Sequence, residues 1–173
     1  MHLIVNEKIT LTEFRPTDQA ACVEYLSDKD IYDRTLRIPH PYTAADFDRW
    51  LRVIVEATEQ HGEPVHFAVR NAAGSLIGGC GFEELAKGHL AQIGYWLAKP
   101  YWSQGIMTAV VGKACEHAFT QWKLVRITAY VFYVNVTSAR VLEKNGFTCE
   151  GNLRKHFLKD RRFLDSKLYA LVR

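Results

Sequence analysis

The chain has 173 residues, enough for one domain of ordinary size, so we expect a single domain over residues 1–173. Apolar residues make up 48% of the chain and charged residues 24%, which excludes a disordered protein. The net charge of +3 is too small to indicate a nucleic-acid binder, so we expect no DNA partner.

Targeting signals and metal motifs are not evident in the sequence. No apolar run approaches the roughly 18 residues that a membrane span needs, and the first residues lack the pattern of a signal peptide. The four cysteines are scattered and form no CxxC pair. We therefore expect a cytoplasmic protein with no membrane partner, no disulfide framework and no metal site.

The sequence contains segments whose apolar residues alternate, as in strands, and segments whose apolar residues recur every three to four positions, as in helices. Period-2 patterns predict strands at 9–14, 65–70, 76–82, 90–97, 124–132, 147–153 and 165–172. Helical spacing and end signals predict helices from Pro16 to Leu26, at 44–60 between a Thr43 cap and a stop at Gly62, at 105–121, and from an Asn135 cap to about Asn145. This order indicates an α/β (α+β) fold.

A turn that contains Gly105 joins the strand at 90–97 to the helix that follows it. The start of a helix presents unpaired backbone N–H groups and the positive end of its dipole, which suits a pyrophosphate. Glycine lets a phosphate approach the backbone, and the hydroxyls of Ser103 and Thr108 can add donors. An ordinary strand–helix connection, with a glycine for tight packing, explains this segment equally well.

A second segment, NVTSARVLEKNGFTCEG at 135–151, lies one strand further along. Together with QIGYWLAKPYWSQGIMT at 92–108, it resembles the acyl-CoA site of the GNAT superfamily of N-acetyltransferases. The likeness is closest to the RimJ/RimL-type branch, which acetylates protein N-termini. IPHPYT at 38–43, LIGGCGF at 76–82 and DSKLYA at 165–170 extend it over essentially the whole chain. The resemblance implies a mixed, mostly antiparallel central sheet with a splayed strand pair, flanked by helices.

The resemblance also implies that acetyl-CoA is the co-substrate. Its pantetheine arm would lie between the splayed strands 94–97 and 125–131, and its pyrophosphate would lie on the turn before the helix. The implied cofactor-binding residues are Trp96, Leu97, Ser103, Gln104, Gly105, Ile106, Met107, Thr108, Asn135 and Ser138. Trp102 and Met107 depart from the usual pattern of this turn, and Met107 is expected to narrow it while leaving its backbone donors. Asn135 is explained equally by helix capping, and Ser138 by a bond to its own backbone.

Leu142 stands where other members of the superfamily have a tyrosine that reprotonates the leaving thiolate. That role then falls to Ser138, to another tyrosine such as Tyr95 or Tyr133, or to water. Among these, Ser138 is the residue that we assign to catalysis.

The attacking amine must be neutral. At pH 7 an α-amine with a pKa near 7.8 is about one part in seven neutral, whereas a lysine amine is about one part in 2,500. An N-terminal amine therefore needs only a weak base. We assign this role to Glu83, which is expected to end a strand together with Glu84. His66 and His156 are further candidates for the base. Each of these four residues is alternatively a solvated strand end or a surface group with no catalytic role.

Three other features are explained by core packing or by exposure to solvent. Cys80 lies within a buried strand, where a thiol is usually inert packing. The basic run at 154–162 predicts an exposed loop, either simply solvated or in contact with an acidic substrate or ribosomal RNA. Tyr42, Phe47 and Trp50 could line an acceptor site, although core packing is favoured for the last two.

The resulting hypothesis is an enzyme that moves an acetyl group from acetyl-CoA to a primary amine by direct attack in a ternary complex. The branch resemblance favours a protein or peptide α-amine, and the runner-up is a small amine such as an antibiotic or polyamine. A strongly acidic pocket would favour a polycation, and the sequence offers no acidic cluster to build one. A non-catalytic acyl-CoA sensor or scaffold is the alternative from another class. Base rates favour a symmetric homodimer.

Overall fold

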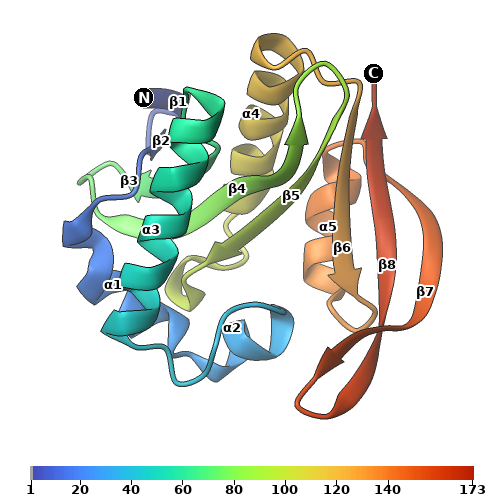
Figure 1. The fold of residues 1–173 in the computed structure, drawn as a ribbon, viewed down its shortest axis with the longest axis horizontal. Helices are drawn as coiled ribbons and strands as arrows, with labels where there is room; N and C mark the ends of the chain where they lie inside the picture. The colour runs from blue at the N-terminus through green and yellow to red at the C-terminus, as the bar shows by residue number, and fades with distance from the viewer. Residues whose placement is uncertain (1) are drawn as a thin grey trace. The chain divides into compact units, whose positions relative to one another are not determined.

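The structure is a computed structural model that describes residues 2–173. Its strands are β1 His2–Asn6, β2 Ile9–Thr12, β3 His66–Asn71, β4 Leu76–Ala86, β5 Leu90–Leu97, β6 Arg126–Phe132, β7 Thr148–Lys159 and β8 Arg162–Val172 (Figure 1). Its helices are α1 Gln19–Leu26, α2 Lys29–Arg34, α3 Ala44–His61, α4 Ile106–Gln121 and α5 Val136–Lys144, with short 3-10 turns at Pro16–Asp18 and Lys99–Tyr101. Most predicted elements are confirmed, whereas β1 and α2 are additional.

The strands hydrogen-bond in the order β1-β2-β3-β4-β5-β6-β8-β7. β5 and β6 pair in parallel, where Leu90–Gln92 face Arg126–Thr128. The pairs β1–β2, β2–β3, β3–β4, β6–β8 and β7–β8 are antiparallel. The predicted mixed, mostly antiparallel sheet is therefore confirmed, and the separation of residues 94–97 from β6 stays a prediction.

The chain forms two compact units. The first contains the residues up to Gly81 together with Tyr95–Val110. Its core is a buried apolar cluster around Phe14, Cys22 and Phe47, against which Trp50, Trp96 and Trp102 pack from partly buried positions. Because strand and helix side chains share this cluster, the end of β5 and the turn after it are anchored to the core of the unit.

Helix α3 has the end signals that its sequence predicts. The Thr43 hydroxyl accepts a hydrogen bond from the Asp46 N–H at 3.3 Å, and the Asp46 carboxylate accepts one from the Thr43 N–H at 2.9 Å. This reciprocal arrangement satisfies two donors at the start of the helix. Gly62 then ends the helix at φ 74°, a conformation that side chains other than glycine rarely adopt.

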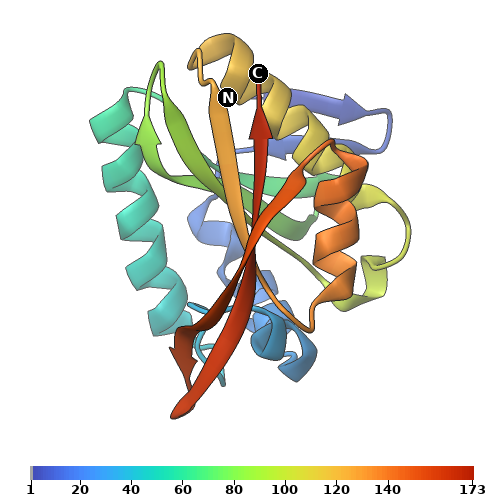
Figure 2. The same cartoon turned by 90° about the vertical axis from the view of Figure 1, so that its right-hand side faces the viewer.

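The second unit contains Phe82–Gly94 and Val111–Arg173. The Phe82 and Trp122 rings meet edge to face with centroids 5.0 Å apart, and both side chains are fully buried. Helix α5 lies along β8, where the Tyr169 hydroxyl donates to the Glu143 carboxylate at 3.0 Å (Figure 2). The position of α5 in this unit is thus fixed by its own core contacts.

The prediction of an exposed loop at 154–162 is wrong. β7 continues to Lys159 and β8 begins at Arg162, so the basic residues form a long hairpin (Figure 1). Its turn residues, Asp160 and Arg161, have φ values of 50° and 61°. The turn lacks the glycine or asparagine that usually marks a hairpin, and an edge strand accepts charged side chains because they face solvent.

Candidate active site

The turn that contains Gly105 has the geometry of an anion site. Gly105 has φ 74°, and the Gly105 carbonyl accepts the N–H of Ala109 at 3.2 Å. Because the helix hydrogen bonds begin there, the N–H groups of Gly105, Ile106 and Met107 have no acceptor within the helix. A Cβ built on Gly105 would meet no atom within 4 Å, so an anion can approach this backbone closely.

Side chains leave most of this turn open. Ser103, Gln104 and Gly105 are exposed, and the Gln104 amide donates to the Pro100 carbonyl at 3.1 Å. The Met107 side chain is only 6% exposed and therefore lies within the unit rather than over the exposed part of the turn. The narrowing expected from Met107 is not evident, since backbone and small polar side chains form the accessible surface.

The end of β5 is held close to β4 by a pair of glycines. A Cβ on Gly78 would lie 2.6 Å from the Trp96 carbonyl oxygen, and a Cβ on Gly79 would lie 2.6 Å from Trp96 Nε1. Leu97 is nearly buried, and its carbonyl accepts a hydrogen bond of 2.7 Å from the indole N–H of Trp102. Trp102 therefore links the end of β5 to the turn, a role that the sequence pattern did not reveal because the bond depends on how the 3-10 turn at Lys99–Tyr101 folds the chain back.

The second unit holds the predicted residues at the start of α5. Asn135 caps this helix, since its Oδ1 accepts the N–H of Ser138 at 3.2 Å. The capping interpretation of Asn135 is therefore confirmed, while its contact with pantetheine stays a prediction. Ser138 is half-buried in the first turn, whereas Leu142 is fully buried in the core. The family's tyrosine position thus holds a packing residue here.

Glu83 is placed differently from the prediction. β4 continues past Glu83 to Ala86, so Glu83 lies half-buried within the strand and does not end it. The strand continues although Glu84 adopts φ 53°, a local irregularity that the sequence does not signal. The assignment of Glu83 as the base stays a prediction.

His66 is the first residue of β3 and is half-buried, so it is a strand end as expected, but its ring is not solvated as a surface group would be. Its Nδ1 is inaccessible and has no hydrogen-bond partner within residues 2–173. The ring packs on Gly81, where a Cβ would lie 2.3 Å from His66 Cδ2, and meets the Trp50 ring edge-on at 6.3 Å. Burial, with a smaller contribution from His61, lowers the pKa of His66 from 6.5 to about 4.

This depressed pKa predicts a stability that depends on pH. Between about pH 6.5 and pH 4 the unfolded chain binds a proton at His66 that the folded chain does not, so stability falls as the pH falls through that window. The shift corresponds to at most about 3 kcal/mol. Urea unfolding of the wild type and of His66→Asn at several pH values measures it. The variant should lose this pH dependence, and equal slopes for the two proteins would contradict the assignment.

Other candidates have structural roles. Cys80 is buried, in agreement with packing, and burial raises the pKa of Cys22 and of Cys115 to about 12. Phe47 and Tyr42 belong to the buried core cluster. Within residues 2–173, no cluster of three or more His, Cys, Asp or Glu residues could hold a metal ion, and no helix there is long and apolar enough to cross a membrane.

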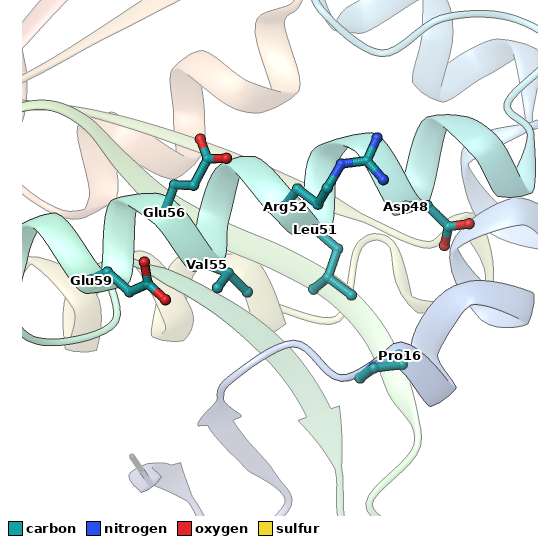
Figure 3. Close-up of a pocket in the computed structure, with 7 residues that line it drawn as sticks. All are labelled: Pro16, Asp48, Leu51, Arg52, Val55, Glu56 and Glu59. Carbon is teal, nitrogen blue, oxygen red and sulfur yellow. The ribbon is translucent and has the colours of Figure 1, made fainter.

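A hollow of about 450 Å³ runs along α3 (Figure 3). It is lined by Pro16, Asp48, Leu51, Arg52, Val55, Glu56 and Glu59. The expectation that the chain has no acidic cluster does not hold here, because helical spacing brings Asp48, Glu56 and Glu59 to one side. Three carboxylates around one arginine would repel an anion, so this hollow does not suit a pyrophosphate.

The fold and the turn point to an acyl-transferring class of enzyme. A family model described as an acetyltransferase (GNAT) domain matches residues 8–148. The chain therefore belongs to the GNAT acetyltransferase family.

Curated relatives agree with this family. The chain is 37% identical over 99 residues to the uncharacterized N-acetyltransferase YoaA of Bacillus subtilis (strain 168), a match that spans 57% of this chain and 56% of that protein. It is 26% identical over 175 residues to the uncharacterized N-acetyltransferase p20 of Bacillus licheniformis, covering 100% of this chain and 97% of that one. The chain thus spans little more than half the length of the first of these relatives and nearly all of the second.

Solved structures share the fold. RimL, a ribosomal L7/L12 alpha-N-protein acetyltransferase in complex with coenzyme A, superposes with a TM-score of 0.89 at 18% identity, over 99% of this chain and 98% of that one. Spermidine N-acetyltransferase from Vibrio cholerae, in complex with CoA and spermine, has a TM-score of 0.81 at 20% identity, over 96% of each chain. At these identities the comparison defines the fold and leaves the acceptor open.

Proposed function

We propose that this protein transfers the acetyl group of acetyl-CoA to the α-amine of a protein or peptide N-terminus, by direct attack in a ternary complex. The observation that carries the proposal is the open turn at Gly105, where unpaired N–H groups meet the positive end of α4. Family membership supports the acetyl transfer. The scattered free cysteines suit a reducing cytoplasm.

Each predicted residue has a part in this proposal. The exposed segment Ser103–Gly105 and the N–H groups that follow it would bind the pyrophosphate, and the backbone at Trp96 would bind the pantetheine. Asn135 would contact the same arm. Ser138 would return a proton to the leaving thiolate, and Glu83 is the sequence-based candidate for the base. A backbone N–H of β5 would stabilise the oxyanion.

The acceptor class rests on the chemistry of the amine and on the branch resemblance. An α-amine is already partly neutral at pH 7 and needs only a weak base. A polyamine is the second candidate, and RimL and spermidine N-acetyltransferase share this fold. The acidic hollow beside α3 gives the polyamine a specific observation in its favour.

An acceptor panel tests the proposal. CoA release would be followed with peptides that carry a free α-amine, with the same peptides blocked at the N-terminus but carrying a lysine, and with spermidine. We expect kcat/KM for the free α-amine to exceed that for the blocked peptide by at least tenfold. Faster turnover of spermidine would favour the polyamine, whereas binding of acetyl-CoA without any turnover would favour a sensor or scaffold.

A further inference from the structure

Strand β7 has a three-residue bulge in the second unit. The pairing register with β8 shifts so that Arg154, Lys155 and His156 stand opposite Asp165 alone. The Lys155 N–H donates to the Asp165 carboxylate at 2.7 Å, and Lys155 has φ 51°. Bulges re-aim side chains and occur often beside active sites, so this one is a defined feature of the hairpin rather than a loose loop.

The bulge fixes the imidazole of His156. Its Nδ1 lies 2.7 Å from the hydroxyl oxygen of Ser166, which is fully buried. The ring also contacts two aromatic neighbours at tilted angles, with centroid distances of 4.0 Å to Phe157 and 4.9 Å to Tyr130. When Nδ1 carries the proton and donates to Ser166, Nε2 is left as the acceptor of the ring.

His156 is exposed and lies beside open space. A surface hollow of about 630 Å³ is lined by Asn152, Leu153, Arg154, Lys155 and His156. An oriented acceptor nitrogen on an accessible side chain is what proton transfer from a bound amine requires.

The start of α5 lies at the end of β6 that faces the bulge. Ser166 pairs with Phe132, the last residue of β6, and the Phe132 carbonyl accepts the Asn135 N–H at 2.8 Å. Asn135 in turn caps α5 by accepting the N–H of Ser138. The bulge that holds His156 and the first turn of α5 therefore flank one end of β6 within a single unit.

We infer that His156 is the residue that accepts the proton of the attacking amine, with Ser166 as its positioning residue. The inference rests on the proposed acetyl transfer. It assigns to His156 the role for which the sequence favours Glu83, with His66 and His156 as further candidates. His156 Nε2 takes one proton from the ammonium form of the acceptor, and the neutral amine nitrogen then bonds to the thioester carbonyl carbon. As the carbon–sulfur bond breaks, the nitrogen gives up a second proton, which passes through Ser138 or water to the thiolate, and the imidazolium releases its proton to solvent.

The charged and titratable groups around His156 come from three strands. Tyr130 faces it from β6, Asp165 lies opposite it in β8, and Arg154 and Lys155 precede it in β7. The Asp165 carboxylate already accepts the Lys155 N–H, so it is engaged within the bulge.

The test compares His156→Gln with the wild type from pH 6 to pH 9.5, using a peptide with a free α-amine. Because glutamine cannot accept the proton, kcat/KM at pH 7 should fall by a factor on the order of 10 to 100. The defect should shrink towards pH 9, where the amine is already neutral in solution. Ser166→Ala should show a smaller defect with the same dependence on pH, and the Kd for acetyl-CoA should stay within twofold.

The exposed His89, in the same unit, supplies a matched control, since His89→Gln should retain the wild-type profile. A defect of equal size at every pH would overturn the inference. So would a wild-type profile for His156→Gln together with the pH-dependent loss in Glu83→Gln. Wild-type turnover in the same assay tests the proposed function separately, because only the ratio of variant to wild type reports on His156.

Discussion

Replacing Asp18 by alanine should lower the free energy of unfolding by about 3–5 kcal/mol. The Asp18 carboxylate accepts two hydrogen bonds from the Arg70 guanidinium, at 2.9 and 2.8 Å, and the two side chains are each only 6% exposed. Arg70 also donates to the Thr12 hydroxyl at 2.7 Å. Removal of the carboxylate would leave a buried cation without its counter-charge, and urea denaturation followed by circular dichroism measures the cost.

Two controls separate burial from charge. Asp33→Ala removes an ion pair with Lys29 in which the side chains are 50% and 69% exposed, so its effect should stay below about 1 kcal/mol. The double variant Asp18→Leu/Arg70→Met removes both charges together and should be more stable than Asp18→Ala. If Asp18→Ala costs no more than Asp33→Ala, the buried pair does not stabilise the first unit.

Gly78→Ala should destabilise the first unit by about 1–3 kcal/mol and weaken the binding of acetyl-CoA. The added Cβ would lie 2.6 Å from the Trp96 carbonyl oxygen and 3.3 Å from the Leu97 Cα. These are backbone atoms, so no rotation of a side chain can relieve the clash, and the end of β5 must move. That segment would bind pantetheine, which is why stability and affinity should fall together.

Gly94→Ala is the matched control in β5. A Cβ at Gly94 would meet no atom within 4 Å, and its φ is not in the left-handed region. Alanine should therefore be neutral there or slightly stabilising, since it restricts the unfolded chain. Thermal unfolding and the Kd for acetyl-CoA would be measured for the two variants. Equal behaviour of Gly78→Ala and Gly94→Ala would contradict the close approach of β4 and β5.

The sequence predicts well where local signals agree. β5 has the predicted bounds, and α3 begins and ends at its predicted cap and glycine because periodicity, capping and the left-handed Gly62 coincide. Helix α2 has six residues, mostly charged, with only Ile31 buried, so no apolar stripe announces it. Its helix is supported by contacts distant in the chain, including the ion pair from Lys99 to Asp30.

In the candidate site, too, some features follow from local sequence patterns and others do not. The turn at Gly105 is predicted because a glycine before an amphipathic helix is a local pattern. The burial of His66 depends on Gly81 and Trp50, which are distant in the sequence. The pairing of His156 with Ser166 depends on a bulge whose register follows from the whole β7–β8 hairpin. Such contacts need tertiary structure and cannot be inferred from residue order.

Calorimetric titration with acetyl-CoA, with desulfo-CoA and ATP as comparison ligands, measures whether the turn at Gly105 holds the cofactor. Desulfo-CoA keeps the pyrophosphate and pantetheine but lacks the sulfur, and ATP supplies phosphates without the pantetheine arm. We expect micromolar binding of acetyl-CoA that survives loss of the sulfur, with much weaker binding of ATP. No binding at millimolar acetyl-CoA would contradict this expectation, because the turn at Gly105 would then not hold the cofactor.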